Sequence, residues 1–481
     1  MTASAPHGAA ASTLPLDVVI LAAGKGTRMK SRIPKVLQKL AGRPLLHHVL
    51  STAAQLGARS AVVVTGHGAP EVEASCARLT PVEGPIALKF VRQEPQLGTG
   101  HAVQQAVPAL GDDGRVLVLS GDVPLTRAET LLELIEAAGP DGEQRLALLT
   151  VELPDPTGYG RIVRSPEGAV RAIVEEKDAT PEQRAIHEVY SGILVAPARW
   201  LKAALARLAN DNAQREYYLT DVVKFAVADG LPVVTHRCGD ALEVAGVNSP
   251  AQLAELERAY QRRAAEALMA QGVRLADPAR FDVRGRLACG SDVDIDVGCI
   301  FEGEVVLGDG VQIGAYCVIA NARIESGAVI APFTHIDGER LGVQVGPGAR
   351  VGPFARLRPG AVLGREVHIG NFVEVKNSTL ADGAKANHLA YLGDASVGER
   401  VNYGAGTITA NYDGANKHRT VIEADVHIGS NSVLVAPVVI GAGGTVGAGS
   451  VVTKDTPAGA LTVARGRQVS IPNWQRPQKK S

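Results

Sequence analysis

The sequence predicts two domains of different architecture, an α/β domain with a mostly parallel sheet followed by a parallel β-helix. Two observations carry this prediction. In the first half of the chain, short apolar runs alternate with helical patterns, which is typical of a sheet covered by helices. In the second half, an aliphatic residue recurs at every sixth position, and such a repeat indicates a parallel β-helix.

The composition fits both halves and excludes several classes of protein. The 481 residues include 53 glycines and only 4% aromatic residues, as expected for tight turns and for a narrow core with little room for rings. Lys and Arg total 49 and Asp and Glu total 50, so the chain has no overall field for nucleic acid or an anionic membrane. No apolar run approaches the ~20 residues of a transmembrane helix. The five cysteines form no CxxC pair, which favours a reducing cytoplasm over a disulfide framework or a zinc site.

Several segments of the first half have the length and pattern of buried strands or of helices. Residues 17–21, 61–65 and 115–120 are short, largely aliphatic runs, as expected for strands buried on both faces. Helical patterns lie between them at residues 45–56 and 101–110. Alternating elements of this kind predict a mostly parallel sheet covered by helices.

Changes of pattern along the chain set the expected domain boundaries. Residues 1–15 are rich in Ala, Ser, Pro and Gly without Lys or Arg, so we expect a disordered tail and not a signal peptide. Residues 16–250 form the α/β domain. Residues 251–271 contain no Gly or Pro and follow the good N-cap Ser249, so they form a single linker helix. Residues 272–481 form the β-helix domain with a C-terminal arm.

The six-residue period is clearest in three parts of the second half. Its members are Ile295, Phe301, Leu307, Ile313 and Ile319, then Val345, Val351, Leu357, Leu363, Ile369 and Val375, then Ile422, Ile428, Leu434, Ile440, Val446 and Val452. In a β-helix each repeat supplies one flat face, three faces complete a coil, and the aliphatic side chain points into the axis. A chance pattern is the alternative, and the length of the repeat argues against it.

The loop after the first expected strand has the residue types of a phosphate-binding segment. It reads Leu21-Ala-Ala-Gly-Lys-Gly-Thr-Arg-Met29, and small residues let backbone N–H groups approach phosphates at the end of a strand. Arg28 and Lys35 add two cations suited to a triphosphate. The spacing matches neither the dinucleotide-binding GxGxxG pattern nor the P-loop. A tight turn without function is the alternative for the glycines alone.

Further segments give this loop a family resemblance. They are Gln93-Glu-Pro-Gln-Leu-Gly-Thr-Gly-His101, Ser120-Gly-Asp122, Thr157-Gly-Tyr-Gly-Arg161, Ile173-Val-Glu-Glu-Lys-Asp178, Glu216-Tyr-Tyr-Leu-Thr-Asp221 and Gly246-Val-Asn248. Together they resemble the binding segments of sugar-1-phosphate nucleotidyltransferases. With its hexapeptide half, the chain is similar over residues 16–474 to the bacterial bifunctional UDP-N-acetylglucosamine pyrophosphorylases/glucosamine-1-phosphate N-acetyltransferases. The resemblance implies a uridyltransferase (pyrophosphorylase) domain with a Rossmann-like mixed sheet, and an N-acetyltransferase domain with a left-handed β-helix.

The resemblance implies roles in uridyl transfer for residues of the first half. Asp122 and Asn248 would hold Mg²⁺, an ion that prefers oxygen ligands, and Arg28 and Lys35 would contact the phosphates in catalysis. Further substrate contacts would come from Leu21, Ala22, Ala23, Gly24, Gln93, Gly98, Thr99, Ser120 and Gly121, and from Gly160 and Glu175 at the N-acetylglucosamine. Taken singly, Asp122 could cap a helix and Glu175 could be a solvated carboxylate. The family has Asn where this chain has Tyr190, so no sugar contact is carried over there.

A second group of segments falls in the β-helix. They are Gly352-Pro-Phe-Ala-Arg-Leu-Arg-Pro-Gly360, Asn387-His-Leu-Ala-Tyr391, Val401-Asn-Tyr-Gly-Ala-Gly406 and Ala410-Asn-Tyr-Asp-Gly-Ala-Asn-Lys-His-Arg419. The last breaks the six-residue period, and an inserted loop on a regular solenoid is a natural place for a site. Hexapeptide β-helices with such segments resemble acyl-CoA-dependent acyltransferases.

The resemblance also implies the parts of an acetyltransferase. Transfer to the amine of glucosamine-1-phosphate needs a base, for which His is suited near neutral pH. His388 would be that base, although a lone His is usually an ordinary surface or core residue. Substrate contacts would come from Arg358, Lys376, Tyr391, Asn402, Asn411, Tyr412 and Lys417, with the three cations on the sugar phosphate. Acetyl-CoA would lie against Ala405, Ser430, Ala448 and Arg465.

The resulting hypothesis is one cytoplasmic enzyme with two active sites. It would acetylate glucosamine-1-phosphate with acetyl-CoA and then transfer uridyl from UTP to the product, which releases pyrophosphate. The UDP-N-acetylglucosamine formed would serve peptidoglycan and lipopolysaccharide synthesis. The small-molecule substrates would be its partners, and three copies would pack side by side as a homotrimer. Two alternatives remain: a nucleotidyltransferase whose β-helix only oligomerises or regulates, and a non-enzymatic scaffold.

Overall fold

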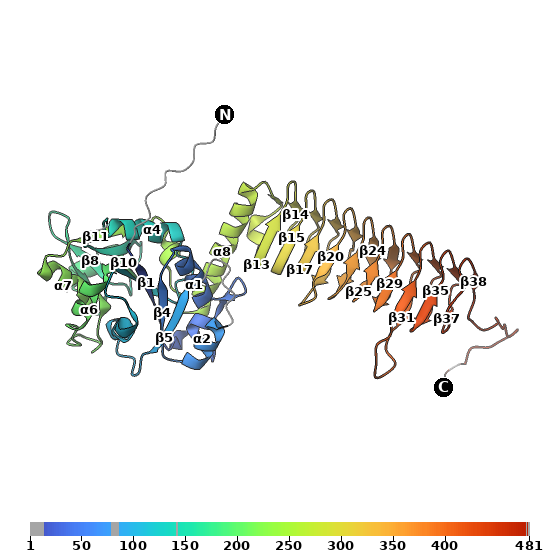
Figure 1. The fold of residues 1–481 in the computed structure, drawn as a ribbon, viewed down its shortest axis with the longest axis horizontal. Coiled ribbons are helices and arrows are strands. Elements are labelled where there is room, and N and C mark those ends of the chain that lie inside the picture. The colour runs from blue at the N-terminus through green and yellow to red at the C-terminus, as the bar shows by residue number, and fades with distance from the viewer. Residues whose placement is uncertain (1–13, 78–85, 141–142, 478, 480–481) are drawn as a thin grey trace, which may run out of the picture. The chain divides into compact units, whose positions relative to one another are not determined.

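The protein folds into two compact units, which meet in the sequence between Tyr260 and Gln261. The computed structural model describes residues 14–77, 86–140, 143–477 and 479. Figure 1 shows that the first unit is a sheet covered by helices and that the second is a regular solenoid of short strands. Both expected fold classes are confirmed.

The first unit is built on a nine-stranded mixed sheet. Its main path runs β11-β7-β10-β6-β1-β4-β5, and β8 and β9 extend it from β10. The strands are β1 (Leu16–Ala22), β4 (Ser60–Thr65), β5 (Ala87–Arg92), β6 (Arg115–Ser120), β7 (Leu146–Glu152), β8 (Arg161–Arg164), β9 (Val170–Val174), β10 (Glu188–Pro197) and β11 (Val233–Arg237). Strand β10 is antiparallel to β6 and β7, whereas β1, β4, β5 and β6 are parallel. A separate small hairpin joins β2 (Lys39–Leu40) to β3 (Arg43–Pro44).

Helices cover both faces of this sheet. They are α1 (Leu45–Gln55), α2 (Ala69–Cys76), α3 (Thr99–Ala106), α4 (Ala128–Ala137), α5 (Pro181–Arg184), α6 (Ala198–Leu205) and α7 (Val222–Asp229). Residues of β1 alternate between two cores: Val18 and Ile20 pack with α1, α2 and α4, whereas Val19 packs with α3, α6 and α7. Because both faces are covered, the strand needs no polar residue at alternate positions. Each large aliphatic side chain buried in this way contributes about 1.5–3 kcal/mol.

The carboxyl ends of the parallel strands form the edge at which the candidate loops begin. Strand β1 has β4 on one side and β6 on the other. The strand order therefore reverses direction at β1, because later strands are added on both of its sides. Such a switch point is where ligands bind in open α/β sheets. The loop after β1, Gln93 after β5 and Asp122 after β6 all lie at this edge.

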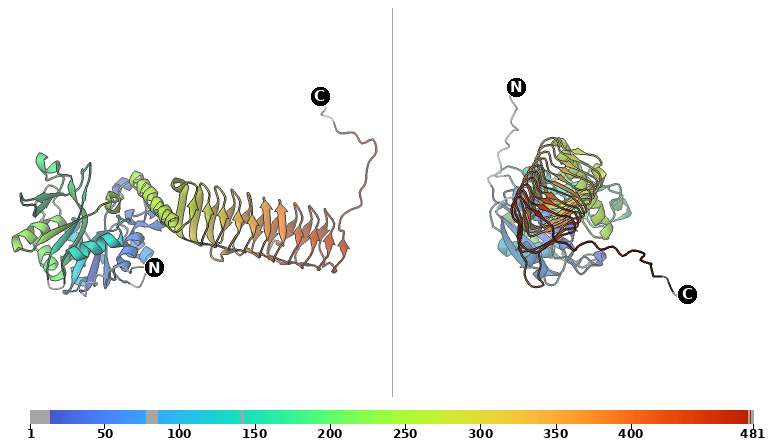
Figure 2. Two further views of the ribbon diagram at one scale, coloured as in Figure 1. Left: turned by 90° about the horizontal axis from the view of Figure 1, so that it is seen from above. Right: turned by 90° about the vertical axis from the view of Figure 1, so that its right-hand side faces the viewer.

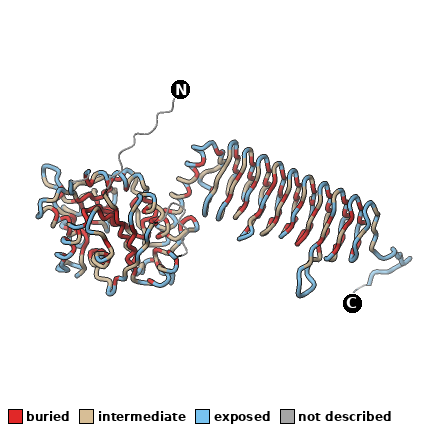
Figure 3. Tube along the Cα trace, viewed as in Figure 1, coloured by how far each residue is buried: buried red, intermediate tan, exposed pale blue. Residues whose placement is uncertain are grey.

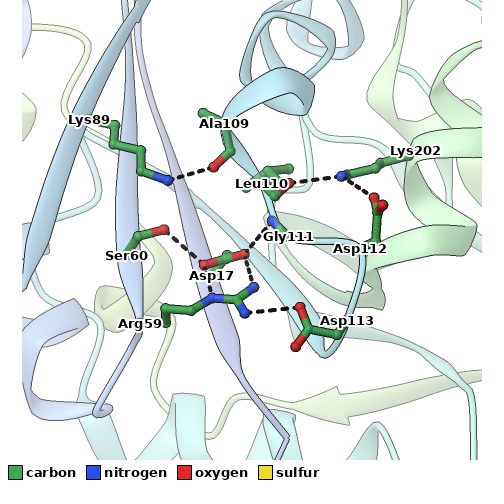
Figure 4. A network of polar contacts seen from close by, with 10 residues as sticks. All are labelled: Asp17, Arg59, Ser60, Lys89, Ala109, Leu110, Gly111, Asp112, Asp113 and Lys202. Carbon is green, nitrogen blue, oxygen red and sulfur yellow. Dashed lines mark hydrogen bonds and ion pairs between the residues drawn. The ribbon is translucent and has the colours of Figure 1, made fainter.

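A polar network secures the opposite edge, at the start of β1 (Figure 4). The Asp17 carboxylate is almost fully buried and accepts hydrogen bonds from Arg59 (2.6 Å), Ser60 (2.8 Å) and the Gly111 amide (3.0 Å). Burial acts to raise the pKa of Asp17, but these hydrogen bonds outweigh it and lower that pKa. Arg59 also donates to Asp113 (3.0 Å). The network therefore joins the first strand to the loop that leads into β6.

One long helix, α8 (Pro250–Ala270), crosses the boundary between the units in the sequence. Ser249 caps it as expected, because its hydroxyl accepts a hydrogen bond from the Gln252 amide (3.3 Å). Leu256 belongs to a core of the first unit, whereas Leu268 belongs to the core of the second. The stretch expected to be a linker thus contributes side chains to two different cores.

His48 on α1 borders the core that contains Leu256. Its Nε2 donates a hydrogen bond to the Leu40 carbonyl (2.9 Å), and its ring meets Tyr260 edge-on at 5.5 Å between centroids. The side chain is only 7% exposed. Burial lowers the pKa of His48 to about 4, so the imidazole is neutral at physiological pH.

The second unit is a β-helix whose coils pair in parallel. One face is the eleven-stranded sheet of β12 (Arg274–Leu275), β14 (Asp294–Ile295), β16 (Gln312–Ile313), β18 (Val329–Ile330), β21 (Arg350–Val351), β24 (His368–Asn371), β27 (Lys385–His388), β30 (Asn402–Tyr403), β33 (His427–Ile428), β36 (Thr445–Val446) and β38 (Leu461–Thr462). The second face comprises β20 (Val343–Val345), β23 (Val362–Leu363), β26 (Thr379–Leu380), β29 (Ala395–Val397), β32 (Thr420–Ile422) and β35 (Val438–Ile440). The third comprises β19 (His335–Asp337), β22 (Arg356–Leu357), β25 (Glu374–Lys376), β28 (Tyr391–Gly393), β31 (Ile408–Ala410), β34 (Val433–Val435) and β37 (Val451–Val452). In the first coils, the longer strands β13 (Phe281–Cys289), β15 (Cys299–Leu307) and β17 (Val318–Ile324) join these two faces.

The aliphatic residues of the six-residue period line the axis of the coils. Every member of the three runs given above is buried in a single continuous core. Figure 3 shows this as buried positions on the strands of each coil, with exposed positions at many of the turns between them. In the right-hand view of Figure 2, the coils overlie one another. The period therefore predicted the core correctly.

Four aromatic rings stack outside this core, at one corner of successive coils. Tyr316, Phe333, Phe354 and Phe372 have ring centroids 5.4, 5.0 and 5.4 Å apart, and about half of each side chain is exposed. Each has φ between 54° and 59°, a left-handed conformation that bulky residues rarely adopt. As expected for a narrow axis, most of the described core positions carry no aromatic side chain. The exceptions among the described residues are Phe281 and Phe301, which are buried in the first coils, and Tyr403, which is buried on β30.

The described residues begin at Leu14 and reach Pro477 and Lys479 near the C-terminus. Residues 1–13 of the expected disordered tail lie outside the described residues. Pro15, also within that expected tail, accepts a hydrogen bond from the Arg115 amide (2.9 Å). The described residues after β38 form an arm without regular helices or strands. Among the described helices, none is long and apolar enough to cross a membrane.

Candidate active sites

The first candidate site begins in the loop after β1. Gly24 is exposed with open space around it, and Gly26 has φ 59°. A Cβ on Gly26 would lie 2.7 Å from the Cβ of Lys35, so glycine is needed for Lys35 to pack against the loop. Arg28, in a 3-10 turn (Thr27–Met29), is exposed on the same loop. The loop thus offers accessible backbone and two cations.

The side-chain oxygens of Asp122 and Asn248 both contact the Lys35 ammonium in this site. The Lys35 ammonium contacts Oδ2 of Asp122 and lies 3.2 Å from Oδ1 of Asn248. The Val247 amide donates to the Asp122 carbonyl (3.0 Å), which joins the segment after β6 to the segment before α8. A carboxylate and an amide oxygen are ligands that a hard divalent ion accepts, and phosphates and water commonly complete such a site. The two residues therefore fit the metal-binding role expected for them.

The segment after β5 is fixed by hydrogen bonds to its own glycine and to the loop. Gln93 is buried and donates to the Gly98 carbonyl (2.9 Å), and Gln96 donates to the Ala23 carbonyl (3.0 Å). A Cβ on Gly98 would lie 2.7 Å from the Tyr217 carbonyl. Thr99 accepts a hydrogen bond from the Leu219 amide (3.2 Å). The expected uridine-binding residues are therefore held by several segments of the unit.

Gly160 precedes β8 and Glu175 follows β9, so the two lie together at one end of this antiparallel pair. A Cβ on Gly160 would lie 2.7 Å from Ile173 and 3.7 Å from both carboxylate oxygens of Glu175. Burial raises the pKa of Glu175, and the Thr220 hydroxyl donates to its Oε1 (2.9 Å). A half-buried carboxylate beside a glycine can recognise hydroxyl or amide groups of a ligand.

Tyr190 lies on β10 beside this pair. Its amide donates to the Gly160 carbonyl (2.9 Å). Its hydroxyl is buried and has no hydrogen-bond partner among the described residues. The departure from the family pattern noted in the sequence therefore replaces a short amide by a buried ring.

The second candidate site surrounds His388 at the end of β27. Its Nδ1 lies 3.0 Å from Oδ1 of Asn371, the last residue of the neighbouring strand β24. The imidazole is exposed. An amide oxygen accepts hydrogen bonds, so it leaves Nε2 as the nitrogen with a free lone pair. This arrangement is suited to a base.

Three cations gather on the third face of the β-helix. The facing Lys417 side chain, followed by burial and by the charge of Arg358, lowers the pKa of Lys376. Arg358 donates to Glu374 (2.8 Å). Like charges this close repel one another, so the arrangement favours an anion that all three can contact. A sugar phosphate is such an anion.

The inserted loop between β31 and β32 protrudes from the coil in Figure 1. Asp413 accepts hydrogen bonds from the Asn416 amide (2.7 Å), the Ala415 amide (2.8 Å) and His418 Nε2 (2.6 Å). These contacts lower the pKa of Asp413. Tyr412 and Lys417 form an isolated antiparallel bridge at the base of the loop. The loop is therefore a fixed hairpin that carries Lys417 toward the cations.

Asp394 holds the predicted sugar-binding residue Asn411. It is buried and accepts hydrogen bonds from the side-chain amides of Asn411 and Asn377. It also opposes the lowering of the Lys376 pKa. Tyr391 lies one coil after Glu374 in register, and its carbonyl accepts from the Tyr403 hydroxyl (3.2 Å). These contacts place Asn411 and Tyr391, two of the three predicted sugar ligands, near the cations.

Three of the four expected acetyl-CoA contacts, Ala405, Ser430 and Ala448, continue a column of residues along the β-helix that includes His388, here called the corner column. Its residues are Asn371, His388, Ala405, Ser430 and Ala448. Each carbonyl of the first four accepts a hydrogen bond from the amide that follows the next member, at distances of 3.0, 3.3, 2.7 and 2.8 Å. Arg465 donates to the Ala448 carbonyl (2.6 Å). The column therefore runs from the candidate base to the last coil.

The structure leaves some predicted residues apart and adds others. Arg465 lies at the far end of the corner column from His388, and Asn402 is exposed on β30. Asn371 and Asp394 were not predicted from the sequence. Both precede a predicted residue by 17 positions, which is the length of a coil in this part of the chain. That spacing was the signal that could have identified them.

Comparisons with known proteins identify relatives of both halves of the chain. The MobA-like NTP transferase domain family matches residues 18–219, and the bacterial transferase hexapeptide family (six repeats) matches residues 342–377 and 419–454. The chain is 74% identical over 474 residues to the bifunctional protein GlmU of Acidovorax sp. (strain JS42), covering 97% of this chain and 99% of that one. The GlmU proteins of Polaromonas naphthalenivorans (strain CJ2) and Azoarcus sp. (strain BH72) are 74% and 59% identical, covering 97% and 96% of this chain and 98% and 100% of their own lengths.

The chain belongs to the bifunctional GlmU family. It is a bifunctional enzyme, with uridyltransferase and acetyltransferase activities that act on small molecules. The alternative of a β-helix that is only structural or regulatory is not favoured, because the similarity extends over nearly the whole chain. The scaffold alternative fails on the same ground.

Proposed function

We propose that the first unit transfers uridyl from UTP to N-acetylglucosamine-1-phosphate and that the second acetylates glucosamine-1-phosphate. The observation that supports this division is that each unit brings together several of the residues predicted for one of the two reactions. Lys35, Asp122 and Asn248 meet in the first unit. His388 and the Lys376 group, which includes Arg358 and Lys417, lie on adjacent faces of the second.

Uridyl transfer is a displacement between two anions. An oxygen of the sugar phosphate attacks the α-phosphorus of UTP, and the bond to the departing pyrophosphate breaks. Asp122 and Asn248 would hold Mg²⁺, which offsets the charge on the phosphates when bound. Arg28 and Lys35 would contact the phosphates. Residues of the loop and of the Gln93 segment would bind the nucleotide, and Gly160 and Glu175 would bind the sugar.

Acetyl transfer needs an amine without its positive charge. The amine nitrogen attacks the thioester carbon of acetyl-CoA, the C–S bond breaks, and the thiolate leaves. His388 Nε2 would take the proton from the nitrogen and pass it to the thiolate. Arg358, Lys376 and Lys417 would hold the phosphate, Tyr391, Asn402 and Asn411 would hold the sugar, and the backbone of Tyr412 would face the thioester oxygen. The coenzyme would lie along the corner column to Arg465.

The two activities would run in sequence on one chain in the cytoplasm. The domains would be residues 16–250 and 272–481, joined by the helix of residues 251–271. Three copies would associate as a homotrimer with acetyl-CoA between neighbouring β-helices. The product, UDP-N-acetylglucosamine, would supply peptidoglycan and lipopolysaccharide synthesis.

A pair of substitutions tests the division of labour. We expect His388→Ala to lower acetyl transfer by about 10²–10⁴-fold, the usual contribution of a general base, and to leave pyrophosphate release from UTP unchanged. Asp122→Ala should abolish pyrophosphate release and leave acetyl transfer unchanged, because the proposed metal ligands lie in the first unit. Thiol release from acetyl-CoA and pyrophosphate release are measured on each variant. If both variants lose both activities, or if His388→Ala retains acetyl transfer within a few-fold, the assignment is wrong.

A further inference from the structure

The backbone of His388 is fixed by the coils on both of its sides. His388 ends β27 and pairs in register with Asn371, which ends β24. The Leu389 amide donates to the Asn371 carbonyl (3.0 Å), and the Gly406 amide donates to the His388 carbonyl (3.3 Å). The position of the imidazole is therefore set by the register of three coils.

A glycine allows the two strands to approach closely at this point. A Cβ on Gly370 would lie 1.9 Å from the Asn387 carbonyl oxygen, a distance that no side chain could adopt. Asn371, which follows Gly370, and His388, which follows Asn387, therefore lie side by side. The rest of each strand keeps the same spacing, because His368 pairs with Lys385 in register.

The side chains of this pair make a direct contact. Nδ1 of His388 lies 3.0 Å from Oδ1 of Asn371. Since the amide oxygen can only accept, the proton of the neutral imidazole is on Nδ1 and the lone pair is on Nε2. The opposite tautomer would place a lone pair against the amide oxygen and would leave no basic nitrogen for a ligand.

The charge of the acceptor also matters for a base. The Asn371 amide oxygen accepts the hydrogen bond without bringing a charge to the imidazole, as a carboxylate would. The strands packed here carry His368 and Lys385 as titratable groups, with Asn402 and Tyr403 on the following strand β30. Burial, followed by the charges of Arg350, Lys385 and His388, lowers the pKa of His368.

We propose that Asn371 is a positioning residue for acetyl transfer, whose side-chain oxygen holds the Nδ1 proton of His388 and so presents Nε2 to the amine. The proposal rests on the assignment of His388 as the base. Asn371 itself does not touch the reacting atoms. It acts by selecting the tautomer and the ring orientation that the proton transfer needs.

Two substitutions in the full-length enzyme separate this role from a structural one. We expect Asn371→Ala to lower kcat for acetyl transfer about 10-fold or more, since part of the contribution of the base is lost, with KM for both substrates changed little. Asn371→Asp keeps an acceptor but adds charge, so the acid limb of the pH profile of kcat/KM should move up by about one pH unit. Uridyl transfer serves as an internal measure of folding. Gln344→Ala, an exposed amide on β20 outside the site, is the matched control and should change neither activity.

Nitrogen NMR of the imidazole gives a readout that does not depend on activity. In the enzyme with its natural Asn371, His388 should be in the Nδ1–H form, and in Asn371→Ala the two tautomers should mix. The proposal is overturned if Asn371→Ala transfers acetyl within twofold of the unchanged enzyme, if the acid limb of Asn371→Asp does not move, or if His388 carries its proton on Nε2. If His388→Ala is inactive in acetyl transfer but Asn371→Ala is fully active, only the positioning role of Asn371 is rejected. If His388→Ala remains active, the assignment of His388 as the base is rejected.

Discussion

The buried imidazole of His48 should make the first unit sensitive to acid. Its pKa falls from 6.5 to about 4 on folding because burial disfavours the charged form. The unfolded chain therefore binds a proton below about pH 6.5 that the folded chain does not bind until near pH 4. Stability is present in full above pH 6.5 and is lost as the pH falls. A shift of this size corresponds to about 3 kcal/mol in total, of which about 2 kcal/mol is lost between pH 7.5 and pH 5.

His48→Gln provides the comparison, because its amide can donate to the Leu40 carbonyl but does not titrate. Urea unfolding of the full chain can be followed by the fluorescence of Trp200 on α6, which reports on the first unit. The other tryptophan, Trp474, is already 62% exposed in the C-terminal arm. Between pH 7.5 and pH 5, the free energy of unfolding should fall about 2 kcal/mol more in the unchanged protein than in His48→Gln. Equal decreases in the two proteins would refute the reasoning.

The remaining predictions concern the second site and the two units. Lys417→Met should raise KM for glucosamine-1-phosphate about 10-fold or more, as expected for the loss of a charge-assisted contact, with uridyl-transfer kinetics unchanged; an unaltered KM would exclude a phosphate contact. A fragment of residues 14–260 should retain uridyl transfer alone. A fragment of residues 261–481 should sediment as a trimer and retain acetyl transfer alone. A monomeric fragment with full acetyltransferase activity would argue against sharing of acetyl-CoA between copies.

Every residue that the hydrophobic period placed in the β-helix core is buried there. An aliphatic side chain at every sixth position has only the axis in which to be buried, and Ile313, Leu357 and Ile440 all lie there. The first unit could be predicted for a related reason, since a run such as residues 17–21 can be buried only if both faces of its strand are covered. In both cases the residue types leave one way to bury the apolar surface.

The contacts within the sites could be predicted only in part. The residue type at Lys35 indicated phosphate binding, and the family resemblance implied a metal ligand at Asn248. These two residues are 213 positions apart, and only the fold brings them together. Coil length limited the prediction in the β-helix. Asn371 pairs with His388 at a spacing of 17 positions, whereas Asn402 pairs with His427 across the inserted loop. A period of six residues does not reveal which polar residues of successive coils become neighbours.

The corner column relates the length of a ligand bound along the β-helix to the number of coils. Neighbouring parallel strands are about 4.8 Å apart, so the three steps from His388 to Ala448 measure about 14 Å. A ligand laid along the column meets one residue per step, and the number of coils sets the length that fits between the two ends. Adding one coil between Ala405 and Ser430 would extend that length by about 4.8 Å while leaving the packing within every other coil unchanged. The distance between the proposed base and the far end of the proposed coenzyme site is thus a whole number of coil spacings.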